Sequence, residues 1–487
     1  MSTTTVCKGK NYIDGEWEES ESGKTFVSVN PADTTETVGI FPASTAEDAR
    51  RAISAAENAF DSWRETSPSQ RAAVLHKAAD ILESRLDQLA WELTREEGKL
   101  LAASRAEVMR SAKTLRYYAV EGLNVTGETF PNDDPQMMVY TAKEPLGVVT
   151  VITPWNFPLS IPARKIAPAL VTGNTVVFKP SSDTPLIGFR LVEALHEAGI
   201  PKGVINLVTG SSSRLGKPLA ADPAIRAISF TGSTAAGEAI HRLTSLTTRI
   251  QMELGGKNPI IVLDDADIDL AAELTVKGAF SLTGQACTGT SRAIVMESVK
   301  EAYLDKLIEK TKKLVIGNGL THGVDMTPVA NQKQLSNILA YLRIGQEEGA
   351  DLVYGGGQLL GGIYERGYYI RPAIFDRVTP EMRIAQEEIF GPVISVLSVG
   401  SYEEAIDVAN HVEYGLSASI VTQNIKMAHQ FAKDIQAGTV KVNRPTTGNL
   451  INAPFGGIKK SSTSTFRESG RAGLDFFTQI KTVYVGS

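Results

Sequence analysis

The sequence predicts an α/β protein with two domains, each built around a largely parallel sheet, and two observations favour this class. The chain has 487 residues, more than a single hydrophobic core normally serves. Short apolar runs rich in β-formers also alternate with helix-like segments, which is the pattern of a parallel sheet covered on both faces. The first series of runs is 148–153, 175–178, 204–208 and 227–230, and the second is 259–263, 293–296, 393–399 and 417–422.

Before residue 147 the sequence predicts short strands at 11–17 and 25–29, followed by helices. Ser67 can cap a helix whose first turn holds Pro68, and Gln70 can reach back to the cap. An apolar stripe at helical spacing follows, and it predicts core packing rather than a binding surface. The stripe consists of Leu75, Ala79, Leu82, Leu86 and Leu89.

Two strand-like segments, 125–144 and 478–485, fit neither sheet. We expect them to pair with each other or with another subunit, so they are candidate oligomer contacts. No Gly/Ser-rich linker separates the two α/β halves. The domains should therefore share a cleft, where cofactors and substrates usually bind.

The composition excludes several classes of partner. The net charge is −6, which gives no reason to expect binding to nucleic acid or to an anionic membrane. No apolar run approaches the roughly 20 residues that span a bilayer, and the N-terminus has no signal-like stretch. Cys7 and Cys287 are the only cysteines, so a disulfide framework is not expected and the cytoplasm is the predicted compartment.

Cys287 and Glu253 are the first candidate catalytic residues. Cys287 lies among small residues in 284–292, which would let a substrate approach its sulfur. Taken alone, a buried cysteine is more often an inert apolar side chain, and a lone glutamate before a Gly-Gly pair is more often a surface or capping residue. Cys7, in the polar N-terminal stretch, is expected to be incidental.

Two loops follow predicted strands at the edge where ligands bind parallel sheets. The loop 153–158 contains Asn156, whose amide could donate to a developing oxyanion, although proline-aromatic turns are common packing elements. In the segment 230–237 a predicted strand is followed at once by the start of a predicted helix. The free backbone N–H groups of a helix N-terminus can bind a phosphate group. The spacing of this segment differs from the common dinucleotide-binding fingerprint, so this signal is weak alone.

Together, the segments around Cys287 and Glu253 and the two loops 153–158 and 230–237 resemble the aldehyde dehydrogenase family. The resemblance extends over nearly the whole chain. Glu253 and Cys287 are 34 residues apart (287 − 253), as in the hydrolytic members of that family. Further matching segments are 178–182, 387–393, 414–418 and 454–459. The resemblance implies a Rossmann-like cofactor-binding domain (1–124 and 145–253), an α/β catalytic domain (254–455) and a small β oligomerisation or bridging element (125–144 and 456–487).

The resemblance implies a role for each catalytic residue. Cys287 would attack the aldehyde carbon, the Asn156 side chain and the Cys287 backbone N–H would hold the oxyanion, and Glu253 would activate water to hydrolyse the resulting thioester. A homodimer or homotetramer is also implied. No His, Cys and carboxylate cluster has metal-ligand spacing, so no metal is expected.

The implied cofactor is NADP, NAD or both. Lys179 resembles the ribose-binding lysine of the family, Glu388 the acid that contacts the nicotinamide ribose, and Ser233 a pyrophosphate contact. Ser182 stands where NAD-preferring members often carry a glutamate, and its lack of charge would tolerate a 2′-phosphate. We therefore predict that NADP is accepted and that NAD is also usable. The remaining predicted cofactor contacts are Trp155, Gly232 and Phe390.

A guanidinium in the substrate tunnel would suit an aldehyde that carries a carboxylate at its far end. Arg164 is the main candidate, although Lys165 could face inward instead and Arg164 could pair with a structural acid. The other predicted substrate contacts are Arg292, Arg444 and Phe455. The segments 442–448 and 461–467 resemble the branch that oxidises α-ketoglutaric semialdehyde (2,5-dioxopentanoate), with succinate semialdehyde or a broad aldehyde range as alternatives.

Three other readings compete. In a CoA-acylating relative the water-activating glutamate is typically absent, and Glu253 is present here. A catalytically silent binding or structural protein could share the scaffold, but Cys287, Asn156 and Lys179 are intact. A cysteine-histidine hydrolase would need a positioned imidazole, and none of the six histidines lies in these motifs.

Overall fold

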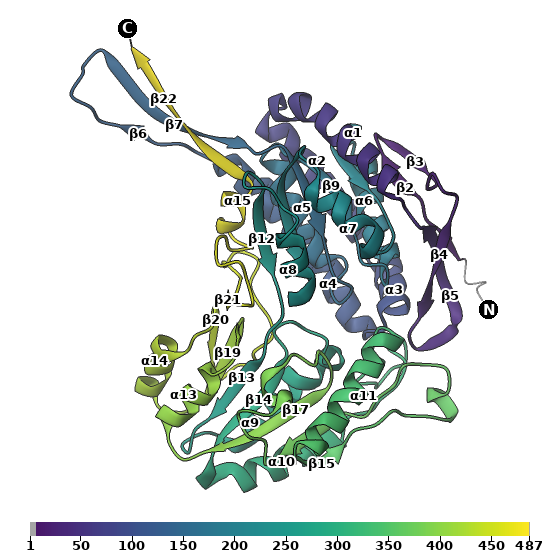
Figure 1. Ribbon diagram of the computed structural model, residues 1–487, viewed down its shortest axis with the longest axis vertical. Coiled ribbons are helices and arrows are strands. Elements are labelled where there is room, and N and C mark those ends of the chain that lie inside the picture. Colours follow the sequence, from purple (N-terminus) through teal and green to yellow (C-terminus); the bar gives the residue numbers. More distant parts are fainter. Residues whose placement is uncertain (1–5, 487) are drawn as a thin grey trace.

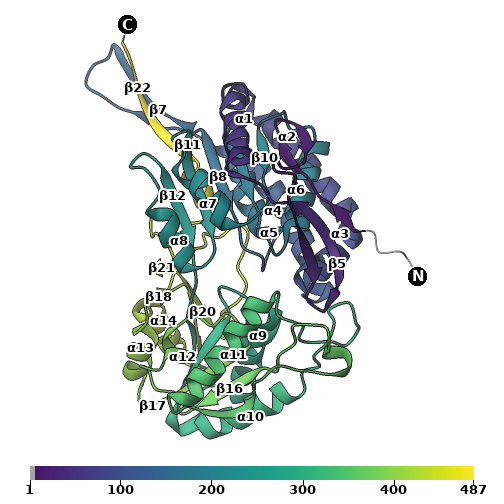
Figure 2. The same cartoon turned by 45° about the vertical axis from the view of Figure 1, so that its right-hand side comes forward.

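The computed structural model describes residues 6–486. Two lobes, each containing a seven-stranded sheet, lie one above the other, and a long β-arm extends from the upper lobe (Figures 1 and 2). This arrangement confirms the predicted α/β class. No helix among the described residues is both long and apolar enough to cross a membrane.

The upper sheet has the strand order β12-β11-β8-β9-β10-β2-β3. Its first five strands are parallel, and the N-terminal hairpin β2-β3 adds antiparallel to β10. All four predicted runs of the first series are strands of this sheet. The strands are β2 (Asn11–Ile13), β3 (Glu16–Glu18), β8 (Val148–Ile152), β9 (Thr175–Lys179), β10 (Ile205–Leu207), β11 (Ile225–Thr231) and β12 (Arg249–Glu253).

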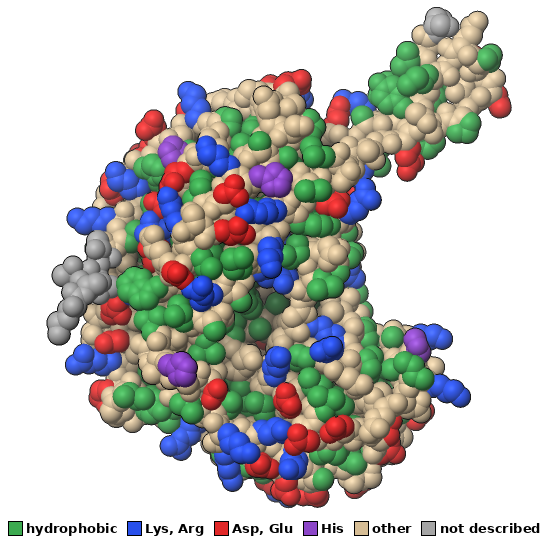
Figure 3. Space-filling view, turned by 180° about the vertical axis from the view of Figure 1, so that it is seen from behind, with side chains coloured by type: hydrophobic (Ala, Val, Ile, Leu, Met, Phe, Trp, Pro, Cys, Tyr) green, Lys and Arg blue, Asp and Glu red, His purple; other side chains and the backbone are tan. Residues whose placement is uncertain are grey.

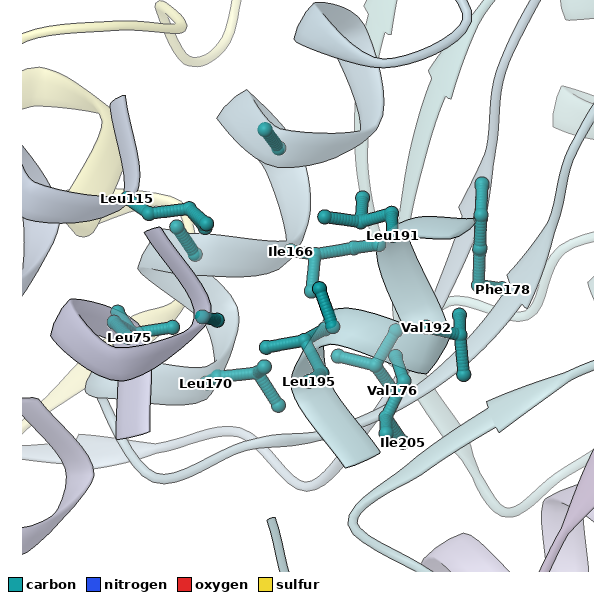
Figure 4. Close-up of a cluster of buried hydrophobic side chains, with 14 of the residues drawn as sticks. Leu75, Leu115, Ile166, Leu170, Val176, Phe178, Leu191, Val192, Leu195 and Ile205 are labelled. Carbon is teal, nitrogen blue, oxygen red and sulfur yellow. The ribbon is translucent and has the colours of Figure 1, made fainter. Parts of the chain in front are cut away.

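Helices cover both faces of this sheet because successive strand residues point to opposite sides. Val149 and Val151 of β8 pack into one core, shown in Figure 4, while Val148 and Ile152 pack into the other. The first core includes α2 (Pro68–Ser84), α4 (Leu101–Glu121), α5 (Ser160–Val171) and α6 (Pro185–Glu197); the second includes α1 (Ala46–Glu65), α7 (Ser212–Ala221) and α8 (Thr234–His241).

The helix predicted to begin at Ser67 is α2, and the reciprocal hydrogen bonds between Ser67 and Gln70 are present. The apolar stripe belongs to two helices, because α2 ends at Ser84 and α3 (Leu86–Glu97) begins after Arg85, which has non-helical dihedrals (φ −106°, ψ 18°). The stripe nevertheless faces the core on both sides of this break. The prediction of core packing is confirmed.

The lower sheet has the order β15-β16-β17-β14-β13-β19-β20, and only the edge strand β15 is antiparallel to its neighbour. Its strands are β13 (Asn258–Val262), β14 (Thr290–Met296), β15 (Asp351–Gly355), β16 (Ala373–Asp376), β17 (Val393–Val399), β19 (Ser417–Val421) and β20 (Thr439–Val442). Its helices are α9 (Ile268–Phe280), α10 (Lys300–Lys312), α11 (Gln332–Glu347), α12 (Arg383–Gln386), α13 (Tyr402–Asn410) and α14 (Ile425–Asp434).

The arm is a three-stranded antiparallel sheet of β6 (Thr129–Phe130), β7 (Met137–Pro145) and β22 (Thr478–Gly486). The predicted pairing of the tail with the segment before residue 145 is present over nine residue pairs, from Thr478–Pro145 to Gly486–Met137. Residues 456–477 return to the body instead, where α15 (Ala472–Asp475) joins the upper core. Smaller sheets join β1 (Cys7–Lys8), β4 (Thr25–Asn30) and β5 (Asp33–Pro42), and β18 (Tyr414–Gly415) with β21 (Ile458–Lys459).

Candidate active site

A pocket between the two lobes brings together half of the predicted site residues, seven of fourteen. A hollow between the lobes, with hydrophobic side chains at its depth, is also visible on the face seen in Figure 3. The pocket lies where β8 and β11 end, at the edge of the sheet where parallel folds bind ligands. Its lining includes Trp155, Asn156, Gly232, Ser233, Cys287, Glu388 and Phe390.

Cys287 lies on a loop that is fixed at several points. Thr283 has a positive φ of 55°, and its hydroxyl donates to the Thr327 carbonyl at 2.7 Å. The Gln285 side chain accepts from the backbone of Ala330 at 2.9 Å. The Cys287 carbonyl accepts from the Asn258 side chain at 2.9 Å. The sulfur is therefore presented from a braced loop, which preorganises it for attack.

Asn156 is buried just after β8, and its side-chain nitrogen donates to the Gln285 carbonyl at 2.9 Å. This contact directs the amide toward the cysteine loop. A side-chain amide carries two N–H donors, so one remains for a ligand. The Asn156 side-chain oxygen is buried with no partner among the described residues.

A buried ion pair, for which the sequence contains no local signal, supports the backbone of the Asn156 loop. Lys99 donates to the Asn156 carbonyl at 2.6 Å and pairs with Glu107 at 2.6 Å. The second Glu107 oxygen accepts the backbone N–H groups of Leu159 and Ser160, at 3.0 and 3.1 Å, where α5 begins. Glu107 thus anchors the loop at the helix start while Lys99 fixes the backbone of the amide donor.

Glu253 ends β12 with its side chain buried. Neither carboxylate oxygen has a hydrogen-bond partner among the described residues. Burial, together with the neighbouring negative charge of Glu468, raises the pKa of Glu253 well above its ordinary value. A raised pKa makes the ionised carboxylate a stronger proton acceptor, which suits a general base.

Glu468 was not predicted as a site residue. It accepts from Lys165, and its other oxygen lies 2.9 Å from Nε of Arg164. Burial alone would raise the pKa of Glu468, but these two cations together hold it below its ordinary value. Lys165 also donates to Ser229 at 3.1 Å. Arg164 and Lys165, the two candidates that the sequence left open, therefore share one acid, and this contact favours the alternative in which Arg164 pairs with a structural carboxylate.

The phosphate-binding signal predicted for 230–237 lies at the start of α8. Ser233 caps this helix by accepting the N–H of Ala236 at 3.4 Å. The hydroxyl oxygens of Thr231 and Thr234 are buried without a partner among residues 6–486. Unpaired donors beside a helix N-terminus fit an anionic ligand such as a pyrophosphate.

Glu388 and Phe390 approach the same pocket from the lower lobe. Glu388 accepts the N–H of Gly256 at 3.0 Å, and a Cβ at Gly255 would lie 2.2 Å from its carboxylate, so a larger residue there would displace Glu388. Burial raises the pKa of Glu388 to about 7. The Phe390 ring meets Trp155 edge-on at 5.4 Å. A carboxylate and two aromatic rings that line one pocket fit the ribose and nicotinamide end of a dinucleotide.

Lys179 is the last residue of β9 in the upper lobe, and Ser182 lies in the loop that follows. Lys179 is buried and donates to the Pro180 carbonyl at 3.1 Å, and burial lowers its pKa to about 8. The Ser182 hydroxyl donates to the Gly210 carbonyl at 2.8 Å. An ammonium and a neutral hydroxyl at this strand end fit a ribose with or without a 2′-phosphate.

The three other predicted substrate residues lie outside the pocket lining. Arg292 is buried, and its guanidinium donates to the carbonyls of Lys257, Val408 and Ala409 at 2.8 to 3.1 Å. The prediction that Arg292 contacts substrate is therefore wrong, because all three nitrogens bind the backbone. Arg444 is exposed. Phe455 is buried beneath Arg164, whose guanidinium carbon lies 5.1 Å from the ring centre.

Comparisons with known proteins agree with this geometry. The sequence profile of the aldehyde dehydrogenase family matches residues 17–483. The chain is 48% identical to an α-ketoglutaric semialdehyde dehydrogenase of Bacillus subtilis, over 98% of this chain and 97% of that protein. It is 45% identical to a 2,5-dioxopentanoate dehydrogenase of Saccharolobus solfataricus, over 96% and 97%. A betaine aldehyde dehydrogenase of Staphylococcus aureus, solved with NAD+, superimposes with a TM-score of 0.95 at 36% identity, over 98% and 94%.

Proposed function

The chain belongs to the aldehyde dehydrogenase family, and from this premise we propose that it oxidises a short acidic semialdehyde, 2,5-dioxopentanoate, to the dicarboxylic acid. The enzyme class is an NAD(P)-dependent aldehyde dehydrogenase. The observation that carries the hydrolytic route is Glu253, a buried carboxyl with a raised pKa and no partner among the described residues. A CoA-acylating enzyme transfers the acyl group to CoA, so it does not need a carboxyl that activates water.

The first step forms a bond between the Cys287 sulfur and the aldehyde carbon. Burial raises the pKa of the Cys287 thiol to about 12, so its proton must leave as the sulfur attacks. Glu253, the free carboxyl of the same site, accepts this proton. The aldehyde oxygen becomes an oxyanion, which the second Asn156 N–H and the Cys287 backbone N–H stabilise. One such donor is typically worth about 3 kcal/mol.

A nicotinamide cofactor, when bound, would supply the hydride acceptor that the adduct on Cys287 needs in order to become a thioester. Ser233 and the start of α8 would hold the pyrophosphate, Glu388 the nearby ribose, and Lys179 the adenosine ribose. Trp155 and Phe390 would exclude water from the ring. The support for these assignments is that Trp155, Ser233, Glu388 and Phe390 line one pocket and that Lys179 ends β9 in the same lobe as Ser233.

Hydrolysis of the thioester completes the cycle. Glu253, after its first proton has passed to solvent, removes a proton from water as the water oxygen bonds to the acyl carbon. The carbon–sulfur bond breaks, the acid departs, and the proton on Glu253 returns to the Cys287 sulfur. A base whose pKa lies near the working pH is the most effective for this transfer.

We propose that NADP is accepted and that NAD is also usable. The support is chemical: Ser182 adds no negative charge beside the adenosine ribose, and the nearby Lys179 ammonium favours a phosphate. Replacing Ser182 with Glu should lower kcat/KM for NADP far more than for NAD. Equal kcat/KM changes for the two cofactors, or a wild-type enzyme that barely uses NADP, would contradict this proposal.

The substrate class rests on relatives of 44–48% identity whose names specify this semialdehyde and on the cations near the pocket. Succinate semialdehyde is the alternative, since it is also an acidic semialdehyde and is shorter by one carbonyl carbon. The test is a panel of 2,5-dioxopentanoate, succinate semialdehyde and pentanal, assayed with NAD and NADP by absorbance of the reduced nicotinamide. The highest kcat/KM should fall on 2,5-dioxopentanoate, and Cys287→Ala should abolish acid formation from each.

We propose that the arm assembles the protein into a homodimer or homotetramer in the cytoplasm. Several large apolar side chains on β6, β7 and β22 are exposed in the single chain, which is typical of an interface. They are Phe130, Met138, Ile480, Tyr484 and Val485. Light scattering of the purified protein should give a multiple of the chain mass, and Ile480→Asp should reduce it; a wild-type monomer would refute the proposal.

A further inference from the structure

A second, smaller pocket lies between α4 and α5, next to the candidate active site. Arg110, Tyr118 and neighbouring residues of α4 form one wall, and Ser160 and Arg164 of α5 form another. Ser469 closes it. None of Arg110, Tyr118 and Ser469 was singled out from the sequence, and the catalytic steps above do not use them.

Two hydroxyl groups in this pocket lack partners. Tyr118 and Ser469 are buried, and neither hydroxyl makes a hydrogen bond within residues 6–486. Buried polar groups of folded proteins are nearly always satisfied, so each unpaired group calls for a ligand or an ordered water. Ser469 also adopts a left-handed φ of 63°, a conformation that is uncommon for serine and that clusters at binding sites.

The pocket also holds a guanidinium without a counterion. Arg164 has a counterion, since its Nε lies 2.9 Å from Glu468. Arg110, in contrast, forms no ion pair with any described carboxylate, and its one side-chain hydrogen bond is to the neutral Asn449 oxygen at 2.8 Å. The pKa of Arg110 is lowered by burial and by the positive charge of Arg164. The guanidinium groups of Arg110 and Arg164 therefore lie near each other, and only Arg164 has a carboxylate partner.

α5 connects this pocket to the cysteine. Ile161 lines the pocket that contains Cys287, whereas Ser160 and Arg164 line the second pocket. These residues lie within about one helical turn, or roughly 5 Å along the axis. A short aldehyde with its carbonyl carbon at Cys287 would therefore extend its other end along α5 toward Arg110.

We propose that this second pocket binds the carboxylate of the substrate, with Arg110 as its charged partner and Tyr118 and Ser469 as hydroxyl donors. A carboxylate offers enough lone pairs for all three groups, and a guanidinium matches its geometry. Arg164 instead acts as a positioning residue that holds Glu468. The inference rests on the proposed acidic semialdehyde, and it transfers the recognition role from Arg164 to Arg110.

The decisive experiment compares Arg110→Gln with Arg105→Gln, a control on the exposed surface of α4 where Arg105 pairs with Asp87. Arg110→Gln should lower kcat/KM for 2,5-dioxopentanoate by about 10- to 100-fold, the range for a lost charged hydrogen bond. It should leave kcat/KM for pentanal within about twofold of the wild type. Arg110→Lys, which keeps the charge, should recover part of the loss, and Arg105→Gln should change neither substrate.

A second readout avoids the chemical step. The product 2-oxoglutarate should inhibit the wild type competitively against the semialdehyde, and Tyr118→Phe and Ser469→Ala should each raise its inhibition constant several-fold. Arg110→Gln lowering kcat/KM equally for both aldehydes, or selectivity lost in Arg164→Gln alone, would overturn the carboxylate pocket. A wild type that oxidises pentanal as well as 2,5-dioxopentanoate would instead contradict the proposed substrate class, so the two failures are distinguishable.

Discussion

Glu253 and Glu468 are two buried carboxyls of one site with opposite electrostatic environments. Their exposed fractions are 2% and 3%, so burial does not distinguish them. Glu468 contacts Lys165 and Arg164, and its pKa is lowered; Glu253 has no hydrogen-bond partner among residues 6–486, and its pKa is raised. Counterions, and not depth, decide which carboxyl is a charged structural group and which can exchange a proton.

Glu468 and its two cations also set the pKa of Glu253. The negative charge of Glu468 raises the pKa of Glu253, while Lys165 and Arg164 lower it. The proton affinity of the proposed base is therefore set by a neighbouring cluster with no direct part in bond making. Removing the members of this cluster one at a time should separate the two kinds of carboxyl.

The largest effect is expected from Glu253→Gln. This change removes the general base, so kcat should fall by about 10²- to 10⁴-fold with little change in KM. Stopped-flow and steady-state assays of nicotinamide reduction measure both parameters. Glu413→Gln is a matched control, because Glu413 pairs with Lys460 at 2.5 Å where both side chains are exposed. A Glu253→Gln enzyme with more than a tenth of the wild-type kcat would refute the assignment.

Glu468→Gln should act first on stability. It leaves Lys165 and Arg164 buried without their acid, and removing one partner of a buried pair costs about 3 to 5 kcal/mol. The midpoint of urea unfolding should fall accordingly. In the folded enzyme the loss of the Glu468 charge should also lower the pKa of Glu253, so the rise of kcat with pH should move to lower pH. An unchanged pH profile would show that the two carboxyls are not coupled.

Glu107→Gln tests whether a buried, paired carboxyl can affect kcat without changing the pKa of Glu253. Glu107 and Lys99 brace the Asn156 loop, so the variant should misplace the oxyanion donor. Loss of a complete donor costs 10²- to 10³-fold, and a displaced one should cost about tenfold in kcat. The pH profile of kcat should keep its midpoint. A shifted midpoint would mean that Glu107 acts through Glu253 rather than through Asn156.

The sequence predicted what local pattern and family motifs encode. It identified Cys287, Asn156 and Glu388, which lie in short motifs and line one pocket, and it predicted the strands because apolar runs are local signals. The partners that tune the site were not predictable in this way. Glu468 meets Lys165 across 303 residues of sequence, and Lys99 meets the Asn156 carbonyl across 57. Such contacts depend on how α4, α5 and the C-terminal segment pack.

Arg292 is the opposite case, a residue that the sequence placed in the site and the structure does not. Its position five residues after Cys287 suggested substrate contact, but the side chain turns into the lower lobe and binds three carbonyls. Sequence proximity to a nucleophile does not fix the direction of a side chain. Direction follows from the strand, and β14 places Arg292 between β13 and β17.

The smallest effect on kcat is expected from Lys165→Met. Met keeps much of the buried volume but removes a cation that lowers the pKa of Glu253, so that pKa should rise further. The base is active when deprotonated, so the rise of kcat with pH should move to higher pH, opposite to the shift expected for Glu468→Gln. At high pH, where Glu253 is deprotonated in both enzymes, kcat should approach the wild-type value. A shift to lower pH, or a loss of kcat that high pH does not restore, would mean that Lys165 acts on something other than the proton affinity of Glu253.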